Sequence, residues 1–278
     1  MLLPSLLRRR LFSSLATATA AAPHISPLTF SDTWAPATVS HISPATSDHT
    51  LFHLTLNLSS HQSLAARHVS SGQFLPLRVP SSCATPPLLL SIASPPHVAQ
   101  LDSEFELLVK RVSGSVSDAL CKMREGDLVE VGEVMGKGFE IQRLWSGHVG
   151  GDDVTLVLMF ATGSGISPIR SLIESGFNEN KKAEVRLYYG ARNLERMAYQ
   201  DRFKYWESSG VKVIPVMSRP EDRWSGARGY VQTTFLREKH ISGPSTGAVL
   251  CGHRQMTEEI TSILLANGVS KEKILTNF

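Results

Sequence analysis

A glycine-rich turn at residues 162–168 carries groups that suit phosphate binding. It reads Thr162-Gly163-Ser164-Gly165-Ile166-Ser167-Pro168, and it stands between a predicted strand and a predicted helix. Glycines let the backbone approach a ligand closely, and the free N–H groups at a helix start attract anions. The turn favours a dinucleotide pyrophosphate, although an ordinary strand-to-helix connection has the same residue types. The candidate binding residues are Thr162, Gly163, Ser164, Gly165, Ile166 and Pro168.

The ends of the next strands carry groups that suit a 2′-phosphate. The acidic residue that usually binds the ribose 2′-hydroxyl is missing, and Tyr188-Tyr189-Gly190-Ala191-Arg192 ends the second strand instead. Arg binds phosphate in a bidentate manner, and Tyr can stack on adenine. Each side chain alone also fits a solvated surface, so their joint placement at strand ends is what favours NADPH over NADH. The acids Glu221 and Asp222, which follow Arg219, would shift the preference back toward NADH. The candidates are Tyr189, Gly190, Ala191, Arg192, Ser218, Arg219, Tyr230 and Gln232.

Three further segments place small or hydroxyl-bearing residues beside strands and helices. Cys251-Gly252-His253-Arg254-Gln255-Met256 offers close ligand approach, although burial is the commoner fate of an isolated cysteine. Gly114-Ser115-Val116-Ser117 precedes a short helical pattern, and it would either cradle phosphate or cap that helix. Leu90-Ser91-Ile92-Ala93-Ser94 ends a strand with residues that suit a flat ring or a turn.

Two halves with different patterns must position these segments. The first half predicts an antiparallel barrel or sandwich with one helix. Its expected elements are strands 37–42, 50–58, 73–79, 88–93, 105–110 and 128–134 and helix 117–123. The second half alternates strands with helices, which predicts a parallel sheet with ligands at the carboxyl ends of its strands. Its expected elements are strands 154–161, 184–189, 211–217, 248–251 and 274–278 and helices 169–175, 199–208, 233–239 and 255–267.

The charge distribution separates the first residues from the rest. Arg8, Arg9 and Arg10 are the only charged residues before Asp32, and without them the chain balances at 25 basic and 25 acidic side chains. A balanced body gives nucleic-acid phosphates little to attract them. Residues 1–25 resemble an organellar transit peptide, for a chloroplast in preference to a mitochondrion, and a secretory signal is the competing interpretation. No apolar run approaches the roughly 18 residues of a membrane span.

The cysteines indicate neither a disulfide framework nor a metal site. Cys83, Cys121 and Cys251 are scattered, and they form no CxxC pair and no cluster with histidines at ligand spacing. An iron–sulfur or zinc centre is therefore not expected.

Taken in order, the segments resemble the ferredoxin-NADP reductase superfamily over residues 34–278, and most closely its plant members of the kiwifruit fruit-protein type. Ser91 to Ser94 is similar to the family's flavin-ring segment, and Gly114 to Ser117 to its flavin-pyrophosphate segment. Thr162 to Pro168 is similar to the nicotinamide-nucleotide pyrophosphate loop, and Cys251 to Met256 to the CGxxxM nicotinamide segment.

The resemblance implies a fold of class β + α/β. A Greek-key β-barrel over 34–146 would bind FAD, and a Rossmann-like domain over 152–278 would bind NAD(P). It also implies catalytic positions. Ser91 would lie near flavin N5, Cys251 would border the nicotinamide, and Phe278 would lie near the stacked rings. The cofactor-binding residues that it adds are Leu90, Ser91, Ile92, Ala93, Ser94, Gly114, Ser115, Val116, Ser117, Cys251, Gly252 and Met256.

The resemblance also has a gap at the flavin. The family pattern before the flavin-ring serine is Arg-x-Tyr, where this chain has Leu88-Leu89-Leu90. Leu90 would then pack the ring as an apolar wall, and Ser117 with Arg78 would serve the phosphates. The function implied is hydride transfer from NAD(P)H to FAD, with electrons passing to a small-molecule or protein acceptor. The alternative is a flavin-poor, nucleotide-binding regulatory or electron-transfer partner subunit on the same fold.

Overall fold

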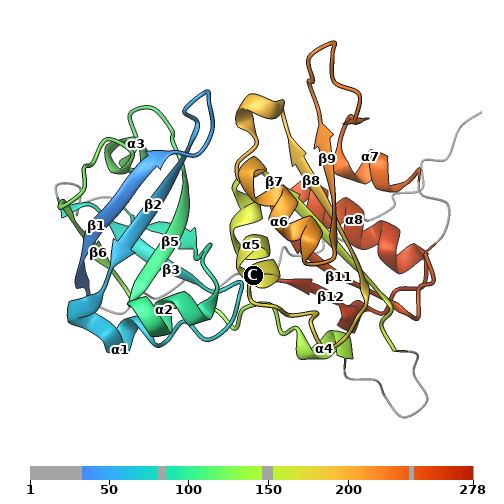
Figure 1. Cartoon of the computed structure of the whole chain (residues 1–278), viewed down its shortest axis with the longest axis horizontal. Helices are drawn as coiled ribbons and strands as arrows, with labels where there is room; N and C mark the ends of the chain where they lie inside the picture. The colour runs from blue at the N-terminus through green and yellow to red at the C-terminus, as the bar shows by residue number, and fades with distance from the viewer. Residues whose placement is uncertain (1–32, 81–85, 146–152, 238–240, 278) are drawn as a thin grey trace, which may run out of the picture. The chain divides into compact units, whose positions relative to one another are not determined.

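The computed structural model describes residues 33–80, 86–145, 153–237 and 241–277. Within these ranges the chain builds an antiparallel sheet followed by a parallel sheet with helices (Figure 1). This confirms the expected β + α/β class, a barrel followed by a Rossmann-like domain. The expected transit peptide over 1–25 and the expected catalytic residue Phe278 lie outside the described residues.

The described part of the first half forms an antiparallel sheet in the order β4-β3-β6-β1-β2-β5. Its strands are β1 (Ala35–Pro44), β2 (Leu51–Asn57), β3 (Phe74–Arg78), β4 (Leu88–Ser91), β5 (Glu104–Lys110) and β6 (Leu128–Val131). An antiparallel bridge between Ile92 and Leu107 joins the segment after β4 to β5. Because β4 and β5 are the two edge strands, this bridge closes the sheet into a barrel.

Alternation along the strands fills the barrel. In β2, Leu54 and Leu56 are fully buried, while Thr55 between them is partly exposed. Successive side chains of a strand point to opposite faces, so this alternation places one face in the core. The barrel core joins these leucines to Phe105 and Val129 from neighbouring strands.

Short helices interrupt the barrel more often than the sequence predicted. They are η1 (Ser59–His61), α1 (Gln62–Ala65), α2 (Pro96–Asp102) and α3 (Val116–Leu120), and a further short helix, α4 (Gln142–Trp145), follows the last barrel strand. The expectation of a single helix over 117–123 was therefore wrong. Helices of three to seven residues are too short to show a helical period, although Pro95-Pro96 marks the start of α2, where Pro is favoured.

The second half is a parallel sheet in the order β10-β9-β8-β7-β11-β12 over its described residues. Its strands are β7 (Leu156–Thr162), β8 (Glu184–Ala191), β9 (Val211–Met217), β10 (Ala227–Arg228), β11 (Thr246–Cys251) and β12 (Ile274–Thr276). Its helices are η3 (Gly163–Gly165), α5 (Ile166–Glu174), η4 (Leu194–Arg196), η5 (Gln200–Arg202), α6 (Phe203–Ser208), α7 (Val231–Phe235), α8 (Arg254–Ala266) and η6 (Lys271–Lys273).

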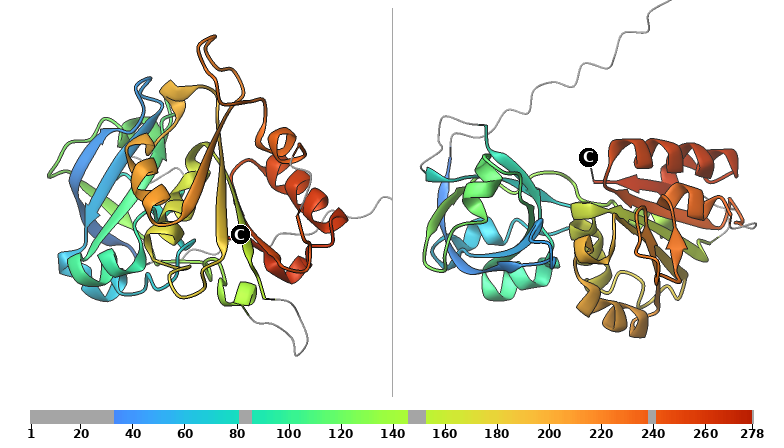
Figure 2. Two further views of the ribbon diagram at one scale, coloured as in Figure 1. Left: turned by 45° about the vertical axis from the view of Figure 1, so that its right-hand side comes forward. Right: turned by 90° about the horizontal axis from the view of Figure 1, so that it is seen from above.

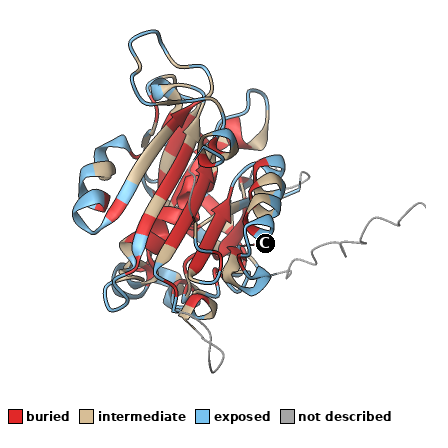
Figure 3. Ribbon diagram, turned by 90° about the vertical axis from the view of Figure 1, so that its right-hand side faces the viewer, coloured by how far each residue is buried: buried red, intermediate tan, exposed pale blue. Residues whose placement is uncertain are grey.

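Helices cover both faces of this sheet (Figure 2). Side chains of β7 alternate between two cores: Met159 packs with residues of α5 and α6, and Phe160 packs with residues of α7 and α8. Because both faces are covered, β7 and β11 are buried almost throughout, and Figure 3 shows the buried strands at the centre of the sheet. This explains their continuous apolar sequence, which is typical of parallel sheets.

Two helices of the second half begin at unexpected places. α5 starts at Ile166 rather than at Ile169, because Pro168 is accepted in a first helical turn, where its missing N–H is not needed. The helix expected over 199–208 is divided. Tyr199 adopts a left-handed conformation with φ of 61°, and a 3-10 turn precedes α6.

Candidate functional site

A cleft of about 1170 Å³ is lined by residues from both sheets. Its lining from the barrel comes from β2, β4 and β5. Its lining from the parallel sheet comes from the carboxyl ends of the strands, where such sheets bind ligands. The lining residues are Thr50, Leu51, Leu89, Leu90, Ser91, Leu108, Lys110, Arg111, Thr162, Gly163, Ser164, Gly165, Ser167, Gly190, Ala191, Arg192, Arg196, Ser218, Gly229, Tyr230, Val231, Gln232, Thr233, Cys251, Gly252, His253, Gln255, Met256 and Glu259.

The sheet register brings the glycine-rich turn beside the other strand ends. Thr162 pairs with Gly190 across β7 and β8, and Ala161 pairs with Cys251 across β7 and β11. The Thr162 hydroxyl accepts a hydrogen bond of 2.8 Å from the backbone N–H of His253. Segments far apart in sequence therefore form one continuous rim of the cleft.

Glycines are required where this rim is most tightly packed. A Cβ atom on Gly165 would overlap the backbone carbonyl of Cys251, and one on Gly252 would overlap the Thr162 side chain. Gly252 also has φ of 147°, which L residues rarely adopt. Gly163, by contrast, has open space beside it. The turn therefore leads into α5 with its backbone open to the cleft, an arrangement that suits an anionic phosphate.

The candidate nucleotide residues divide into those on the cleft and those behind it. Tyr189 is fully buried, and its hydroxyl accepts from the N–H of Ala198 at 3.2 Å and donates to the carbonyl of Gly163 at 3.4 Å. Burial raises its pKa, so the hydroxyl stays protonated. Tyr189 thus supports the glycine turn from below, and Ile166 and Pro168 are also buried in α5 without lining the cleft.

The groups expected at a 2′-phosphate lie at the rim. Arg192, Ser218 and Tyr230 line the cleft, whereas exposed Arg219 does not. The backbone N–H of Arg219 donates to the carbonyl of Arg192 at 2.7 Å, so the two arginines stand on adjacent strand ends.

A glutamate that the sequence interpretation missed also borders the cleft. Glu259 on α8 accepts hydrogen bonds of 2.8 Å from Gln232 and 2.7 Å from Gln255. The first of these bonds holds the amide group of Gln232, one of the candidate nucleotide residues.

The barrel contributes an apolar wall with one hydroxyl. Leu90 and Ser91 line the cleft, whereas Ile92, Ala93 and Ser94 are fully buried behind them. The Ser91 hydroxyl oxygen accepts a long hydrogen bond of 3.4 Å from the side-chain amide of buried Asn277. The hydroxyl proton of Ser91 is thereby left to donate elsewhere. Asn277 was missed because no sequence signal links residues so far apart.

Cys251 lines the cleft while being 8% exposed. Burial raises the pKa of its thiol to about 12, so the group is a neutral thiol at physiological pH. A neutral thiol is a poor nucleophile, and it acts here as a small, polarizable surface. In the described residues no group of histidine, cysteine, aspartate and glutamate has the arrangement of a metal site.

The segment expected to bind flavin pyrophosphate does not line the cleft, and its polar groups bond within the chain. The Ser117 hydroxyl lies 2.8 Å from that of Ser115, and it accepts from the N–H of Val112 at 3.2 Å. The N–H of Gly114 donates to the carboxylate of Asp118 at 3.2 Å.

Asp118 forms ion pairs with two cationic side chains of this region. It is 6% exposed, and it forms ion pairs of 2.8 Å with Lys122 and 2.7 Å with Arg111. Hydrogen bonds from Lys122, Arg111 and the backbone of Gly114 hold its pKa well below the usual range. Arg111 itself lines the cleft. Its guanidinium would be a partner for a flavin phosphate, but it is already paired with the Asp118 carboxylate. Arg78 likewise pairs with Glu130 at 2.7 Å.

The ring end and the phosphate end of a flavin therefore meet different surroundings. The wall of Leu90 and Ser91, with Leu51 and Leu108 also on the cleft, fits a flat apolar ring. The phosphate end meets a segment whose hydroxyls and cations are already bonded. The residues present fit the ring of FAD but, in this arrangement, not its pyrophosphate.

Comparison with known proteins decides the family. Residues 159–262 match the family model described as the oxidoreductase NAD-binding domain. The chain is 46% identical over 246 residues to fruit protein pKIWI502 of Actinidia deliciosa, covering 87% of this chain and 76% of that protein. The chain belongs to the ferredoxin-NADP reductase superfamily. The superfamily consists of NAD(P)H-dependent flavin oxidoreductases and electron-transfer proteins.

More distant superfamily relatives agree on the architecture. The chain is 27% identical over 184 residues to NADH-cytochrome b5 reductase 1 of Kluyveromyces lactis, covering 62% of each chain. A solved ferredoxin NADP+ reductase from Neisseria gonorrhoeae with bound FAD and NADP superposes with a TM-score of 0.71 at 18% identity, covering 87% of this chain and 97% of that chain. None of the helices in the described residues is long and apolar enough to cross a membrane.

Several cleft residues escaped the sequence interpretation, among them Thr50, Lys110, Arg111, Arg196 and His253. Lys110-Arg111 did carry a signal, because a basic pair ends a predicted strand just before the Gly114 turn. Arg196 carried none, since its place on the cleft depends on the loop after β8 folding back.

The tight packing at Gly165 yields a first prediction. Gly165→Ala should weaken NADP+ binding about tenfold or more, because its Cβ atom would push the glycine turn away from Cys251. Isothermal titration with NADP+ measures the affinity. Gly210→Ala is the control, since Gly210 has φ of 90° but open space beside it, so that variant loses stability without moving the turn. Equal affinities for Gly165→Ala and wild type would contradict the role of the turn.

Proposed function

We propose that this chain is an NAD(P)H-dependent flavin oxidoreductase that passes electrons to a separate acceptor. One observation carries the proposal: the glycine turn at the start of α5 and the Leu90–Ser91 wall of the barrel line the same cleft. A nucleotide held at the turn and a flat ring held at the wall would therefore share one enclosed space. Holding two reactants together in this way removes much of the entropic cost of their reaction.

Each part of the cleft has a distinct task in this proposal. A bound flavin would supply the chemistry. It would accept a hydride, which carries two electrons and one proton, from the nicotinamide, and it would release the electrons singly or in pairs. Leu90, with Leu51 and Leu108, excludes water from the ring face. Ser91, whose oxygen accepts from Asn277, offers its proton to the ring edge. Cys251 provides a neutral surface for the nicotinamide that does not compete as a nucleophile.

Electrons would pass from a bound flavin to the acceptor. The acceptor is proposed to be a small molecule or another protein. We further propose that residues 1–25 direct the chain to an organelle, a chloroplast in preference to a mitochondrion. The acid-free, arginine-containing start of the sequence supports this proposal.

Reconstitution with FAD tests the activity. The purified chain should acquire flavin absorption when FAD is added, and it should then oxidise NADPH with an artificial acceptor such as ferricyanide. The flavin-free chain, with the same acceptor, is the control. If neither FAD nor FMN binds, the oxidoreductase proposal is wrong for this chain.

A second candidate function is favoured by the phosphate end of the flavin site. Leu88 and Leu90 stand where the family has Arg and Tyr, and Asp118 holds Arg111 in an ion pair. A chain with these features would bind flavin weakly, and it would serve as a nucleotide-binding regulatory or electron-transfer partner subunit.

Asp118 decides between tight and weak flavin binding in this account. Asp118→Asn should raise the affinity for FAD and FMN about tenfold, because Arg111 would be released and one negative charge removed from the phosphates' surroundings. Riboflavin, which has no phosphate, should bind as before. Titrations followed by flavin fluorescence measure all three affinities. Glu133→Gln removes one charge from an exposed barrel ion pair with Arg67, and it should change none of them. An equal gain for riboflavin would exclude a phosphate effect.

We also propose that NADPH is preferred to NADH. Arg192 and Ser218 line the cleft at neighbouring strand ends, and Arg219 stands next to them. A hydrogen bond from a charged group contributes about 1.5–3 kcal/mol, and each 1.4 kcal/mol is about tenfold in affinity.

The cofactor preference predicts different effects for the two arginines. Arg192→Ala should lower the ratio of kcat/KM for NADPH to that for NADH about tenfold, and Arg219→Ala should lower it less because Arg219 does not line the cleft. Steady-state kinetics with both nucleotides measures the ratio. A ratio that neither substitution changes would show that these residues do not bind the 2′-phosphate.

A further inference from the structure

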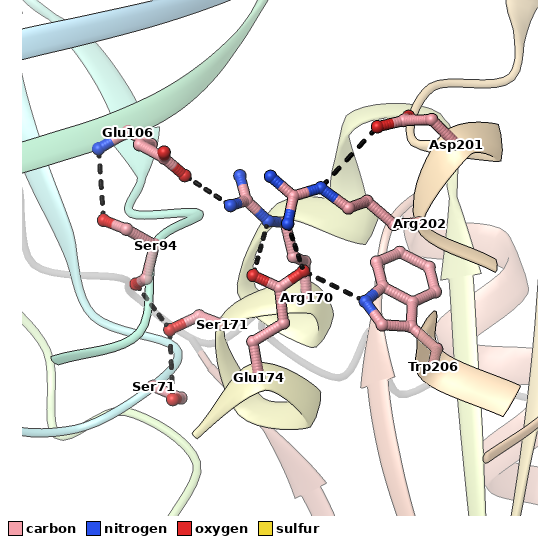
Figure 4. Close-up of polar contacts among 9 residues, drawn as sticks. All are labelled: Ser71, Ser94, Glu106, Arg170, Ser171, Glu174, Asp201, Arg202 and Trp206. Atoms are coloured by element: carbon pink, nitrogen blue, oxygen red, sulfur yellow. Dashed lines mark hydrogen bonds and ion pairs between the residues drawn. The ribbon is translucent and has the colours of Figure 1, made fainter. Parts of the chain in front are cut away.

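A buried arginine on α5 forms ion pairs with both halves of the chain. Arg170 is 5% exposed and is the fifth residue of α5, which begins directly after Gly165. Its guanidinium forms an ion pair with Glu106 of β5 in the barrel. It also forms an ion pair of 3.0 Å with Glu174 on its own helix. Figure 4 shows Arg170 between the two carboxylates.

The nucleotide-binding half holds this arginine from several sides. The Glu174 carboxylate accepts a hydrogen bond of 3.0 Å from the indole N–H of Trp206, and it lies 3.8 Å from Arg202. The Arg170 guanidinium also lies 4.9 Å from the ring centroid of Tyr199. Burial alone would lower the pKa of Arg170, but Tyr199, Glu106 and Glu174 outweigh it, and the net shift is upward. Arg170 is therefore a permanent cation fixed to α5.

Glu106 in turn holds the segment that carries the ring wall. Its backbone N–H donates to the hydroxyl of Ser94 at 3.1 Å, and its carbonyl accepts from the N–H of Ala93 at 2.7 Å. Ala93 and Ser94 follow Leu90 and Ser91, which line the cleft, after one intervening residue. Glu106 thus holds the segment after the Leu90–Ser91 wall with its backbone. It holds α5 with its side chain.

A second contact runs beside the ion pair. Ser171, the neighbour of Arg170 on α5, donates through its hydroxyl to the carbonyl of Ser94 at 2.8 Å. That hydroxyl also lies 3.0 Å from the hydroxyl of Ser71 (Figure 4). The barrel and α5 are therefore joined by directional polar bonds, in a region where water is largely excluded.

We propose that Glu106 and Arg170 form a clamp that sets the spacing between the Leu90–Ser91 wall and the Thr162–Gly165 turn. Both are positioning residues, because neither lines the cleft. Apolar surfaces tolerate sliding, whereas opposite charges in contact resist separation. α5 is rigid over the short distance from Arg170 to the turn, so a shift of the ion pair would move the turn with it. The clamp itself is independent of the proposed function; its effect on catalysis rests on that function.

Distance measurement between spin labels tests the clamp without any cofactor. One label replaces exposed Leu101 on α2 of the barrel, and the other replaces exposed Glu207 on α6, in a Cys83→Ser background. Cys121 and Cys251 react slowly with the label because both are largely buried and their pKa values are raised. Wild type should give one narrow distance distribution by pulsed electron resonance.

Glu106→Gln is the main variant, because Glu174 still neutralises Arg170 and the fold is retained. Its distance distribution should shift or at least double in width, and Arg170→Gln should do the same. Arg67→Gln breaks an exposed ion pair of 2.9 Å with Glu133, and both residues of this pair belong to the barrel half. Its distance distribution should match that of wild type. Distributions for Glu106→Gln and Arg170→Gln that coincide with that of Arg67→Gln would overturn the clamp.

A second readout separates positioning from binding. In Glu106→Gln loaded with FAD, the rate at which NADPH reduces the flavin should fall about tenfold, while the Kd of NADP+ for the flavin-free protein changes less than twofold. A fall in nucleotide affinity equal to the fall in rate would overturn the positioning role. If wild type itself transfers no hydride, the proposed function fails, and the distance distributions still decide the clamp.

Discussion

The hydrogen bond from the Ser171 hydroxyl to the carbonyl of Ser94 places the two halves of this protein against each other. Ser171 belongs to the helix that begins at the glycine turn, and Ser94 ends the segment that begins at the apolar wall. Both side chains are fully buried. A buried hydroxyl and carbonyl without partners would cost about 1–3 kcal/mol each, so this contact admits few alternative arrangements. The contact joins the two segments whose other ends line the cleft.

Much of this architecture is visible in the sequence because it depends on local patterns. Alternation in Leu54, Thr55 and Leu56 indicates a half-buried strand, and the continuous apolar run through Met159 and Phe160 indicates a strand covered on both faces. The glycine turn between that strand and a helix predicts the phosphate-binding end of the sheet. These signals lie within a few residues of each other, so no tertiary contact is needed to interpret them.

The residues that the sequence did not predict act across long separations. Asn277 reaches Ser91, and Glu106 reaches Arg170, through contacts that exist only in the folded chain. Tyr189 looked like a nucleotide ligand because it ends a strand, but the pleat directs it into the core beneath the turn. The sequence predicts where along a strand a residue lies. Whether its side chain faces the cleft or the core depends on what packs against each face of the sheet.

The chain departs from the superfamily pattern around the proposed flavin site. Leu88 and Leu90 stand where the family pattern has Arg and Tyr, and the carboxylate of Asp118 forms ion pairs with Arg111 and Lys122. A ligand phosphate must compete with that carboxylate for the same cation. On the proposed function, flavin binding would depend on the ring more than on its charged tail.

Diffraction from crystals of this chain grown with FAD and NADP+ tests the central claim, that one cleft holds both rings. We expect the isoalloxazine ring to lie against Leu90 with one edge at the Ser91 hydroxyl. We expect the nucleotide pyrophosphate to lie at the turn before α5. A nucleotide at that turn with no flavin at the Leu90–Ser91 wall would contradict it.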